Sequence, residues 1–542
     1  MTGARLPSCA EAVASWLARL GCERVFLVPG ARIDPLVAAV ADGPVLPVVA
    51  QSELGAAFMA DGHARRTGRP GACLMTGGPG TAYAAAGAIT ARLEGVPVAF
   101  VSGSPAADEG DGAFQDTGCD GWRDAAVMER AVDLSLEAGA PAALPAVLAD
   151  AAARLAGRPA GPVHIVLPLD VQDAPAPAIA PPAAAPPSAA PFDAGALDGM
   201  ASLRHPALVA GPAALAGGTP ELLRAVAETY VLPVVTTFAA KGAIDEDHPL
   251  CLGPIGYGEG LHATRLLRRG DLGGLLALGA DLSERDPNGR RPGPLPDLVL
   301  HATDPAAALA WMLENRDGRL RALAAGASAR RAWIAGLRAG PGRRPCRPPE
   351  PGEAMAVDTL VTALRAAAPR DTVLFCDAGL FRPFVGHHWT TPFAGGFHAA
   401  PRTAPMGWAI AAGIGASLAH PHTPVLVVTG DGCMRMLGPE LATAVRYGAP
   451  VTVVVSDNAM LGNVHLRARA RTPGAAALSL LPRIDWVAFA RSLGAAAVAA
   501  DTPAAVADAL AAARRIAGPF VIAVPTRADP FGADGVTAPP PP

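Results

Sequence analysis

The chain alternates short apolar runs with longer segments whose apolar residues recur at helical spacing. In the first third, the runs expected to be strands lie at 24–28, 45–49, 72–75, 96–102 and 163–167. The segments between them are rich in alanine, and Ser8 with Glu11 forms a capping box ahead of an expected helix at 12–20. Strands that alternate with helices favour a parallel sheet covered on both faces. The pattern therefore predicts a doubly wound α/β domain.

The same alternation recurs twice along the rest of the chain. Further strands are expected at 207–210, 231–236, 274–278, 298–301, 372–376, 424–429, 451–456 and 520–524. Segments rich in proline with alanine or glycine, at 174–192 and 339–353, are interpreted as linkers because proline disrupts helix interiors and central strands. The sequence thus predicts three doubly wound parallel-sheet domains at 1–173, 193–338 and 354–528, followed by a loose tail at 529–542.

Composition limits the class of protein. The 542 residues are 51% hydrophobic and 17% charged with a net charge of −4, which allows several cores and excludes a basic nucleic-acid surface. The eight cysteines contain no CxxC pair, as expected in a reducing cytosol. The apolar stretch at 406–419 is shorter than the roughly 20 residues that span a bilayer, so a buried helix is expected there. The N-terminus has no signal-peptide pattern, and we expect a cytoplasmic protein without nucleic-acid or membrane partners.

Two of the expected strands deliver polar residues to one edge of the third sheet. The run at 424–429 leads into a Gly-Asp-Gly sequence centred on Asp431, and the run at 451–456 is followed by Asn458, 27 positions after Asp431. Neighbouring parallel strands end at the same carboxyl edge, where open α/β sheets bind ligands. Asp431, Asn458 and the carbonyl of Met460 are oxygen donors of the kind that Mg²⁺ shares with phosphates. The pattern predicts a cation and diphosphate site.

This arrangement resembles the cofactor signature of thiamine diphosphate-dependent enzymes. The segment 440–447, within an expected helix at 439–447, narrows the resemblance to the acetolactate synthase-like branch. Asp457 stands where that family usually has asparagine, and Cys433 where serine is common. The resemblance implies Mg²⁺ ligands at Asp431, Asn458 and Met460. The implied cofactor-binding residues in the third domain are Ala378, Gly379, Ala404, Met406, Gly430, Asp431, Gly432, Cys433, Asn458, Met460, Leu461 and Gly462.

The resemblance also assigns roles within two loops of the third domain. Met406 would be the wedge that folds the two cofactor rings together, and the carbonyl of Ala404 would accept a hydrogen bond from the cofactor's amino group. Ala378 and Gly379 would offer backbone N–H groups to the diphosphate. Residues 402–405 replace glycines of the family pattern, so this loop departs from it.

A glutamate in the first domain completes the resemblance. Glu53 follows the expected strand at 45–49 and starts a helix, where a carboxylate most often serves as a cap. The segment 51–65 and the Gly-Pro-Gly turn within 76–81 are similar to the family's glutamate segment. The resemblance implies that Glu53 binds a pyrimidine nitrogen of the cofactor and controls its protonation. Because family sites lie between subunits, we expect a homodimer or homotetramer with active sites at the interface.

The reaction is indicated by fewer residues. Phe114 and Gln115 resemble a Phe-Gln element that faces the reacting carbon in acetolactate synthase-like carboligases. The paired histidines of the pyruvate decarboxylase branch are absent from the first domain, which favours carboligation with a 2-oxo acid donor. Leu380 and Phe381 stand where acetolactate synthase usually has glutamine and histidine, so a non-housekeeping substrate is expected.

Alternatives remain at this point. A non-ligating 2-oxo acid decarboxylase or lyase, and an inactive cofactor-binding homologue, share these motifs. A nucleotide-binding oxidoreductase is disfavoured because no G-x-G-x-x-G sequence joins a strand to a helix. FAD or ADP in the central domain stays open without a supporting motif, and the basic run at 285–291 is interpreted as a solvated loop. The sequence assigns no role to His387, His388, His398 and Arg402.

Overall fold

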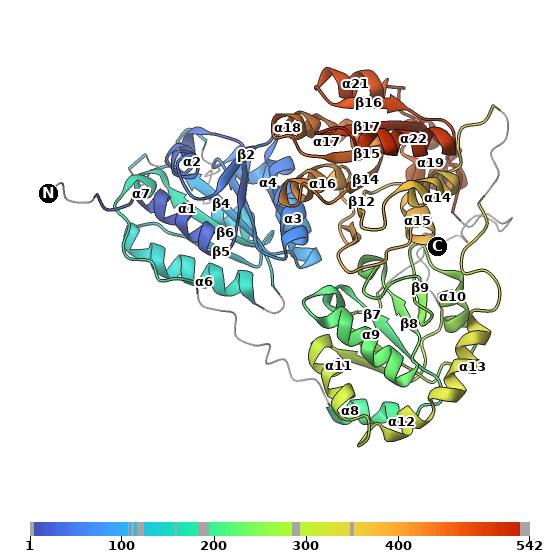
Figure 1. Ribbon diagram of the computed structural model, residues 1–542. Helices are drawn as coiled ribbons and strands as arrows, with labels where there is room; N and C mark the ends of the chain where they lie inside the picture. Colours follow the sequence, from blue (N-terminus) through green and yellow to red (C-terminus); the bar gives the residue numbers. More distant parts are fainter. Residues whose placement is uncertain are drawn as a thin grey trace.

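The computed structural model describes residues 5–106, 108–109, 113–115, 124–157, 160–182, 194–283, 293–346 and 352–531. Within these ranges the chain forms three α/β domains, each built on one parallel sheet (Figure 1). The expected fold class is therefore confirmed. The basic run at 285–291, most of the proline-rich stretch in 174–192, part of the segment at 339–353 and most of the tail lie outside the described residues.

The N-terminal domain has a six-stranded sheet in the order β2-β1-β3-β4-β6-β5. Val25 and Leu27 of β1 pack into one apolar cluster and Phe26 into another, so both faces of the sheet are covered. The strands are β1 (Arg24–Leu27), β2 (Leu46–Val49), β3 (Gly71–Met75), β4 (Val98–Ser104), β5 (Leu134–Glu137) and β6 (Val163–Pro168). The helices are α1 (Cys9–Arg19), α2 (Asp34–Ala41), α3 (Glu53–Thr67), α4 (Pro79–Glu94), α5 (Asp124–Glu129), α6 (Leu144–Ala156) and α7 (Leu169–Asp173).

The central domain has a five-stranded sheet in the order β11-β10-β7-β8-β9. Its strands are β7 (Pro206–Ala210), β8 (Val234–Thr236), β9 (Cys251–Pro254), β10 (Gly274–Leu278) and β11 (Val299–Ala302). Its helices are α8 (Ala194–Asp198), α9 (Thr219–Tyr230), α10 (Leu261–Arg268), α11 (Pro305–Glu314), α12 (Arg321–Ala325) and α13 (Ala327–Leu337).

The C-terminal domain repeats the six-stranded arrangement in the order β13-β12-β14-β15-β17-β16. Its strands are β12 (Val373–Cys376), β13 (Phe397–Ala399), β14 (Val425–Gly430), β15 (Val451–Asp457), β16 (Ala496–Ala499) and β17 (Phe520–Pro525). Its helices are α14 (Val357–Ala367), α15 (Arg382–His388), α16 (Trp408–Ala419), α17 (Asp431–Leu437), α18 (Leu441–Arg446), α19 (Gly462–Arg471), α20 (Pro473–Ala476), α21 (Trp486–Ser492) and α22 (Pro503–Ala513).

The structure corrects the expected elements in two respects. Four edge strands have no counterpart among the expected runs, namely β5, β9, β13 and β16. A helix was expected from 439, but α17 already begins at Asp431, and a 3-10 turn at Gly438–Glu440 separates it from α18. Asp431 therefore occupies the first turn of a helix rather than a loop.

The helices α3 and α16 join the two outer domains in backbone contact. They lie side by side between the N-terminal and C-terminal sheets (Figure 1). A Cβ atom at Gly62 would overlap the carbonyl oxygen of Ala412, and one at Gly415 would overlap that of Met59. A single apolar cluster includes residues from both domains around this crossing. The expected buried helix at 406–419 is thus α16, and none of the helices in the described ranges is long and apolar enough to cross a membrane.

We predict that Gly415→Ala lowers the free energy of unfolding by about 1–3 kcal/mol, because the added methyl group has to push the two helices apart. Chemical denaturation measures this change. Gly474→Ala is the matched control, since an added Cβ there meets nothing within 4 Å. An equal effect of the two substitutions would contradict the close crossing.

Candidate active site

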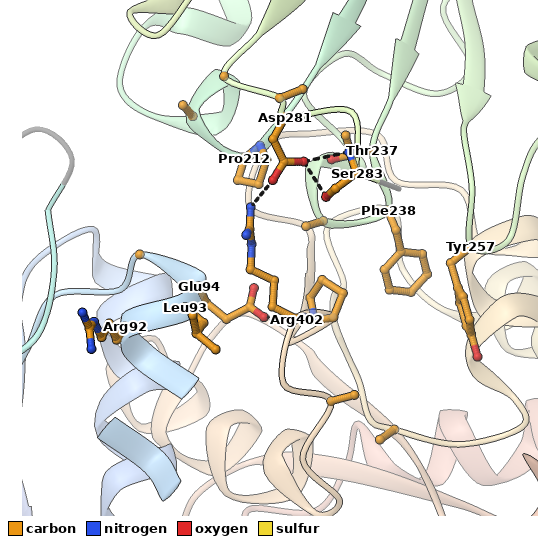
Figure 2. A pocket seen from close by; sticks show the side chains of 18 of the residues that line it. Arg92, Leu93, Glu94, Pro212, Thr237, Phe238, Tyr257, Asp281, Ser283 and Arg402 are labelled. Carbon is orange, nitrogen blue, oxygen red and sulfur yellow. Dashed lines mark hydrogen bonds and ion pairs between the residues drawn. The ribbon is translucent and has the colours of Figure 1, made fainter. Parts of the chain in front are cut away.

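A cavity of about 2070 Å³ lies between the three domains and receives side chains from each of them. Part of its wall is drawn in Figure 2. The predicted cofactor residues of the third domain that line it are Ala378, Gly379, Ala404, Met406, Gly430, Asp431, Gly432, Cys433, Asn458, Met460, Leu461 and Gly462. Residues from distant parts of the C-terminal domain therefore converge on one space.

Strand register brings Asp431 and Asn458 to the same edge of the sheet. β14 and β15 are parallel neighbours in which Gly430 pairs with Ser456, so Asp431 and Asn458 follow these strands at nearly the same level. Asp431 is 3% exposed, and its Oδ2 has no hydrogen-bond partner among the described residues. The Asn458 carboxamide oxygen accepts a hydrogen bond from the backbone N–H of Met460 at 3.2 Å. The edge thus presents oxygen donors to the cavity.

The charge at this edge suits a divalent cation. Burial, and secondly the negative charge of Asp457, raise the pKa of Asp431 to about 6. A buried carboxylate oxygen without a hydrogen donor, facing a second carboxylate, is costly unless a cation lies between them. The donor set of carboxylate, carboxamide and backbone carbonyl oxygens is the set that Mg²⁺ takes. The residues present therefore fit a hard dication with phosphate oxygens.

Glycines keep the wall of the cavity close to this edge. A Cβ atom at Gly432 would lie 2.8 Å from Leu461 Cδ2 and 2.9 Å from Met406 Cε, so these two side chains converge over the glycine. A Cβ at Gly462 would lie 3.2 Å from Asn458 Nδ2. Larger residues at either position would displace the groups that line the cavity.

Asp377 ties together three backbone segments around the cavity and was missed in the sequence. It is fully buried and follows β12; its Oδ1 accepts the N–H groups of Ala378 at 2.8 Å and Gly407 at 3.0 Å. Its Oδ2 accepts the hydroxyl of Thr429 at 2.8 Å. The turn at Ala378, the loop that ends at Gly407 and the end of β14 are thus held by one carboxyl group. A polar residue directly after a buried strand was the signal that could have revealed it.

Cys433 adds a further link to the same turn. Its thiol donates a hydrogen bond to the carbonyl of Ala378 at 3.0 Å. Burial raises the pKa of Cys433 well above its usual value, so the thiol stays neutral and can donate. Cys433 therefore occupies the first turn of α17 as a small hydrogen-bond donor.

The loop at 400–407, called the wedge loop below, is braced by helix α4 of the N-terminal domain. Ala404 has a φ of 48°, in the left-handed region that favours glycine, and Gly407 has a φ of 87°. The backbone N–H of Arg402 donates to Glu94 Oε1 at 2.8 Å, and the hydroxyls of Thr403 and Thr90 lie 3.2 Å apart. These contacts hold the strained loop in place just before its turn at Ala404.

Glu53, Phe114 and Gln115 form a separate group in the N-terminal domain. They are described by the structure but do not line the cavity within one chain. A Cβ at Gly80 would lie 3.1 Å from Glu53 Oε1 and 2.9 Å from the Thr76 methyl group. The Thr76 hydroxyl donates to Gln115 Oε1 at 3.2 Å. Thr76 thus binds Gln115 and lies, like Glu53, against Gly80.

Two buried charges, both missed in the sequence, hold this second group. The Arg32 guanidinium is 6% exposed, donates to the carbonyl of Phe114 at 2.8 Å and pairs with Glu109 at 2.5 Å. Glu440 of the C-terminal domain accepts the backbone N–H of Gln51 and the hydroxyl of Ser52, each at 3.0 Å. Arg32 therefore fixes the Phe-Gln loop, and Glu440 fixes the start of α3.

The histidines without an assigned role are buried outside the cavity. His387 Nδ1 lies 2.6 Å from the carbonyl of Glu259, and its Nε2 accepts the N–H of Arg344 at 2.8 Å. Burial lowers the pKa of His388 to about 4 and that of His398 to about 3. These three histidines do not line the cavity, whereas Arg402 does.

The fold and this cavity define a thiamine diphosphate-type enzyme, and comparison with known proteins agrees. Family models described as the N-terminal TPP binding domain, the central domain and the C-terminal TPP binding domain of thiamine pyrophosphate enzymes match residues 7–121, 194–308 and 377–524. The chain belongs to the thiamine pyrophosphate enzyme family, in its acetolactate synthase-like branch. The resemblance inferred from the motifs is confirmed.

Relatives of this chain include both synthases and decarboxylases. A putative acetolactate synthase large subunit of Mycobacterium tuberculosis is 31% identical over 91% of this chain and 93% of its own length. Acetolactate synthase isozyme 2 large subunit of Escherichia coli is 30% identical over 82% of both chains. A probable 2-ketoarginine decarboxylase of Pseudomonas aeruginosa is 29% identical over 84% of this chain and 82% of its own length. The fold also matches a Rhodococcus jostii thiamine diphosphate-dependent 4-hydroxybenzoylformate decarboxylase, with a TM-score of 0.78 at 20% identity, covering 96% and 100% of the two chains.

We predict that Asp377→Ala lowers the free energy of unfolding by about 2–4 kcal/mol, because it leaves two buried N–H groups without an acceptor. Asp377→Asn, which keeps one acceptor oxygen, should cost less. Burial raises the pKa of Asp377 to about 6, so the folded state binds its proton more tightly than the unfolded state.

The stability that Asp377 contributes is therefore fully present below about pH 4 and declines as the pH rises to about 6. Asp377→Asn should remove this decline. Denaturation at several pH values measures both effects, and equal losses in the alanine and asparagine variants would contradict the role of the carboxyl oxygen as an acceptor.

Proposed function

We propose that the protein is a thiamine diphosphate- and Mg²⁺-dependent carboligase that uses a 2-oxo acid as donor. The observation that supports this most is the unpartnered, buried Oδ2 of Asp431, which lies in a cavity beside Asn458 and Met460. When bound, the cofactor supplies an electron sink next to the carbonyl carbon of the substrate. The remaining steps are positioning and proton control by this chain's own residues.

The C-terminal domain holds the phosphate end of the cofactor in this proposal. Asp431, Asn458 and the carbonyl of Met460 bind Mg²⁺, and Gly430, Gly432 and Cys433 let the backbone approach the diphosphate. Ala378 and Gly379 add backbone N–H groups at the end of β12. Leu461 and Gly462 close the wall behind Asn458.

In this proposal the wedge loop holds the ring end of the cofactor. Met406 lies beside the first turn of α17, where a Cβ at Gly432 would meet its Cε at 2.9 Å, so its side chain projects into the cavity wall. The positive φ of Ala404 turns the backbone of this loop and sets the direction of the Ala404 carbonyl. In this proposal Met406 folds the rings together, and the carbonyl of Ala404 accepts a hydrogen bond from the cofactor's amino group.

The N-terminal domain supplies the proton-controlling group. Glu53 binds a pyrimidine nitrogen of the cofactor, while Gln115 and Phe114 face the reacting carbon. Gln115 is oriented by Thr76 and has a φ of 57°. Since these residues lie outside the cavity of their own chain, the site is completed by the C-terminal domain of a second copy.

Exposed apolar side chains on α4 support a homodimer or homotetramer. Tyr83, Ile89 and Leu93 are 66%, 41% and 47% exposed and follow one another along this helix. Exposed apolar side chains on a helix that starts beside Glu53 are typical of a surface that another chain covers, although Leu93 also lines the cavity. The helix also starts at the Gly-Pro-Gly turn, so the same contact would bring Glu53 close to the cavity of the partner.

Carboligation is favoured over simple aldehyde release by the side chains around the cation edge. After decarboxylation, the outcome depends on whether a proton or a second carbonyl compound reaches the reacting carbon. Leu380, Leu461 and Val464, which line the cavity near Asn458, cannot donate a proton, and Tyr257, which lines the same cavity, is engaged with Asn463. Decarboxylation without ligation remains the second candidate, because a decarboxylase stands among the relatives.

We predict that Glu53→Gln lowers decarboxylation of any 2-oxo acid at least about a hundredfold, because glutamine cannot exchange the proton. Binding of thiamine diphosphate, followed by calorimetry, should change little. Glu23→Gln, at an exposed glutamate of the same domain that pairs with Arg69, is the control. Unchanged turnover in Glu53→Gln would rule out the assignment.

We further predict that mixing the Glu53→Gln and Asp431→Asn variants restores activity. If each site combines Glu53 of one chain with Asp431 of another, a mixed dimer has one intact site, and about a quarter of the wild-type rate is expected after subunit exchange. If both residues of a site came from the same chain, no intact site would form and the mixture would stay inactive.

A further inference from the structure

Arg402 projects from the wedge loop into the cavity and reaches the central domain (Figure 2). Its guanidinium pairs with Asp281, which follows β10, at 2.8 Å. Both side chains remain half-exposed, at 53% and 52%. An ion pair that water reaches on both sides contributes little to stability, so it can be exchanged for another partner.

The two members of this ion pair differ in the hydrogen bonds that each keeps when the other is removed. Asp281 Oδ1 also accepts the backbone N–H and the hydroxyl of Ser283, at 2.9 Å and 2.6 Å. Although burial raises the pKa of Asp281, these hydrogen bonds and the Arg402 guanidinium lower it below its usual value. Among the described residues, Asp281 is the side chain that accepts a hydrogen bond from the Arg402 guanidinium. Asp281 thus keeps two hydrogen-bond donors when Arg402 leaves, whereas the Arg402 guanidinium keeps only its electrostatic interaction with Glu94 and can take a new anion.

The backbone of Arg402 is fixed while its side chain is free to swing. Glu94 accepts the Arg402 N–H, and the neighbouring Thr403 contacts Thr90. The same loop carries Met406, so the backbone of Arg402 stands at a set position relative to the ring end of the cavity. Figure 2 also shows the aromatic side chains of Phe238 and Tyr257, which line the same cavity. A cation on a fixed loop, in a cavity that is also lined by Arg382 and aromatic side chains, is the kind of group that orients a ligand.

We propose that Arg402 recognises a second carboxylate at the far end of the 2-oxo acid, which makes a dicarboxylic 2-oxo acid the preferred donor. The inference rests on the proposed function and names the substrate class of the same site. On binding, the substrate carboxylate replaces Asp281 as the partner of the guanidinium, whose planar fork suits a carboxylate.

The first test compares 2-oxoglutarate with 2-oxopentanoate, which have the same carbon chain and differ in the terminal carboxylate. The wild-type protein, loaded with thiamine diphosphate and Mg²⁺, should show the higher kcat/KM for 2-oxoglutarate. Arg402→Gln should reduce this preference about tenfold, as expected for the loss of one charge-assisted pair. Arg402→Lys should retain part of it, and Asp281→Asn should increase it by removing the competing carboxylate.

Arg92→Gln is the matched control, because Arg92 lines the same cavity but pairs with Asp133. It should leave the preference unchanged. An equal loss for both substrates in Arg402→Gln would show that Arg402 only supports the wedge loop, and the proposal would be wrong. A wild-type preference for 2-oxopentanoate would also overturn it.

A binding measurement separates this inference from the proposed function. Glutarate, an unreactive dicarboxylate, should raise the melting temperature of the wild type more than pentanoate does, and Arg402→Gln should abolish the difference. This binding comparison remains informative even if the wild type turns over neither 2-oxo acid. Such a lack of turnover would count against the proposed function alone. An equal shift in both proteins, or no shift in either, overturns the role of Arg402.

Discussion

The backbone contact between α3 and α16 is the constraint on which the two halves of the site depend. α3 begins at Glu53, and α16 begins directly after Met406 and Gly407. Because Gly62 and Gly415 let these helices touch, the positions of their first residues are fixed relative to each other across two domains. A wider crossing would shift the wedge loop and Glu53 at the same time, although the proposed function assigns these two groups to different sites. Packing far from the cavity therefore fixes the two half-sites that one chain contributes relative to each other.

Buried carboxyl groups separate structural positions from the candidate site. Burial raises the pKa of Asp377, Glu440 and Asp431 alike. Asp377 and Glu440 each accept at least three hydrogen bonds from the protein, which offsets the cost of burial. Asp431 alone among these three keeps an oxygen without a donor. That difference, rather than burial or pKa, is what marks Asp431 as a ligand of something outside the chain.

Sequence reasoning reached the parts of the fold and site that depend on short-range patterns. The buried strands β14 and β15 were predicted because they are continuous apolar runs, and their parallel pairing then placed Asp431 near Asn458. The strands β5 and β16 were missed because their burial is partial and their residues include small or polar side chains. The start of α17 was missed because a Gly-Asp-Gly sequence favours a turn as much as a helix start.

The residues that sequence reasoning missed have partners far along the chain. Arg32 contacts Phe114, and Glu440 contacts Gln51, so no local pattern marks either of them. The sequence shows Arg402 only as a departure from a glycine-rich loop. Its proposed role depends on its ion pair with Asp281 of another domain, which no local pattern reveals. Contacts of this kind depend on how domains pack, which periodicity does not encode.

The division of the site between two groups also bears on how the protein is stabilised. Within one chain burial and the nearby charge of Asp457 raise the pKa of Asp431 in spite of Arg435, and Glu53 stands apart from this cation edge. Repulsion at that edge opposes the compact C-terminal domain until a cation is bound. A ligand that binds the folded form alone stabilises it in proportion to its occupancy, and contacts from a second copy would add to that binding under the proposed function. Cofactor loading and stability are therefore expected to rise together, because both depend on the buried carboxyl group of Asp431.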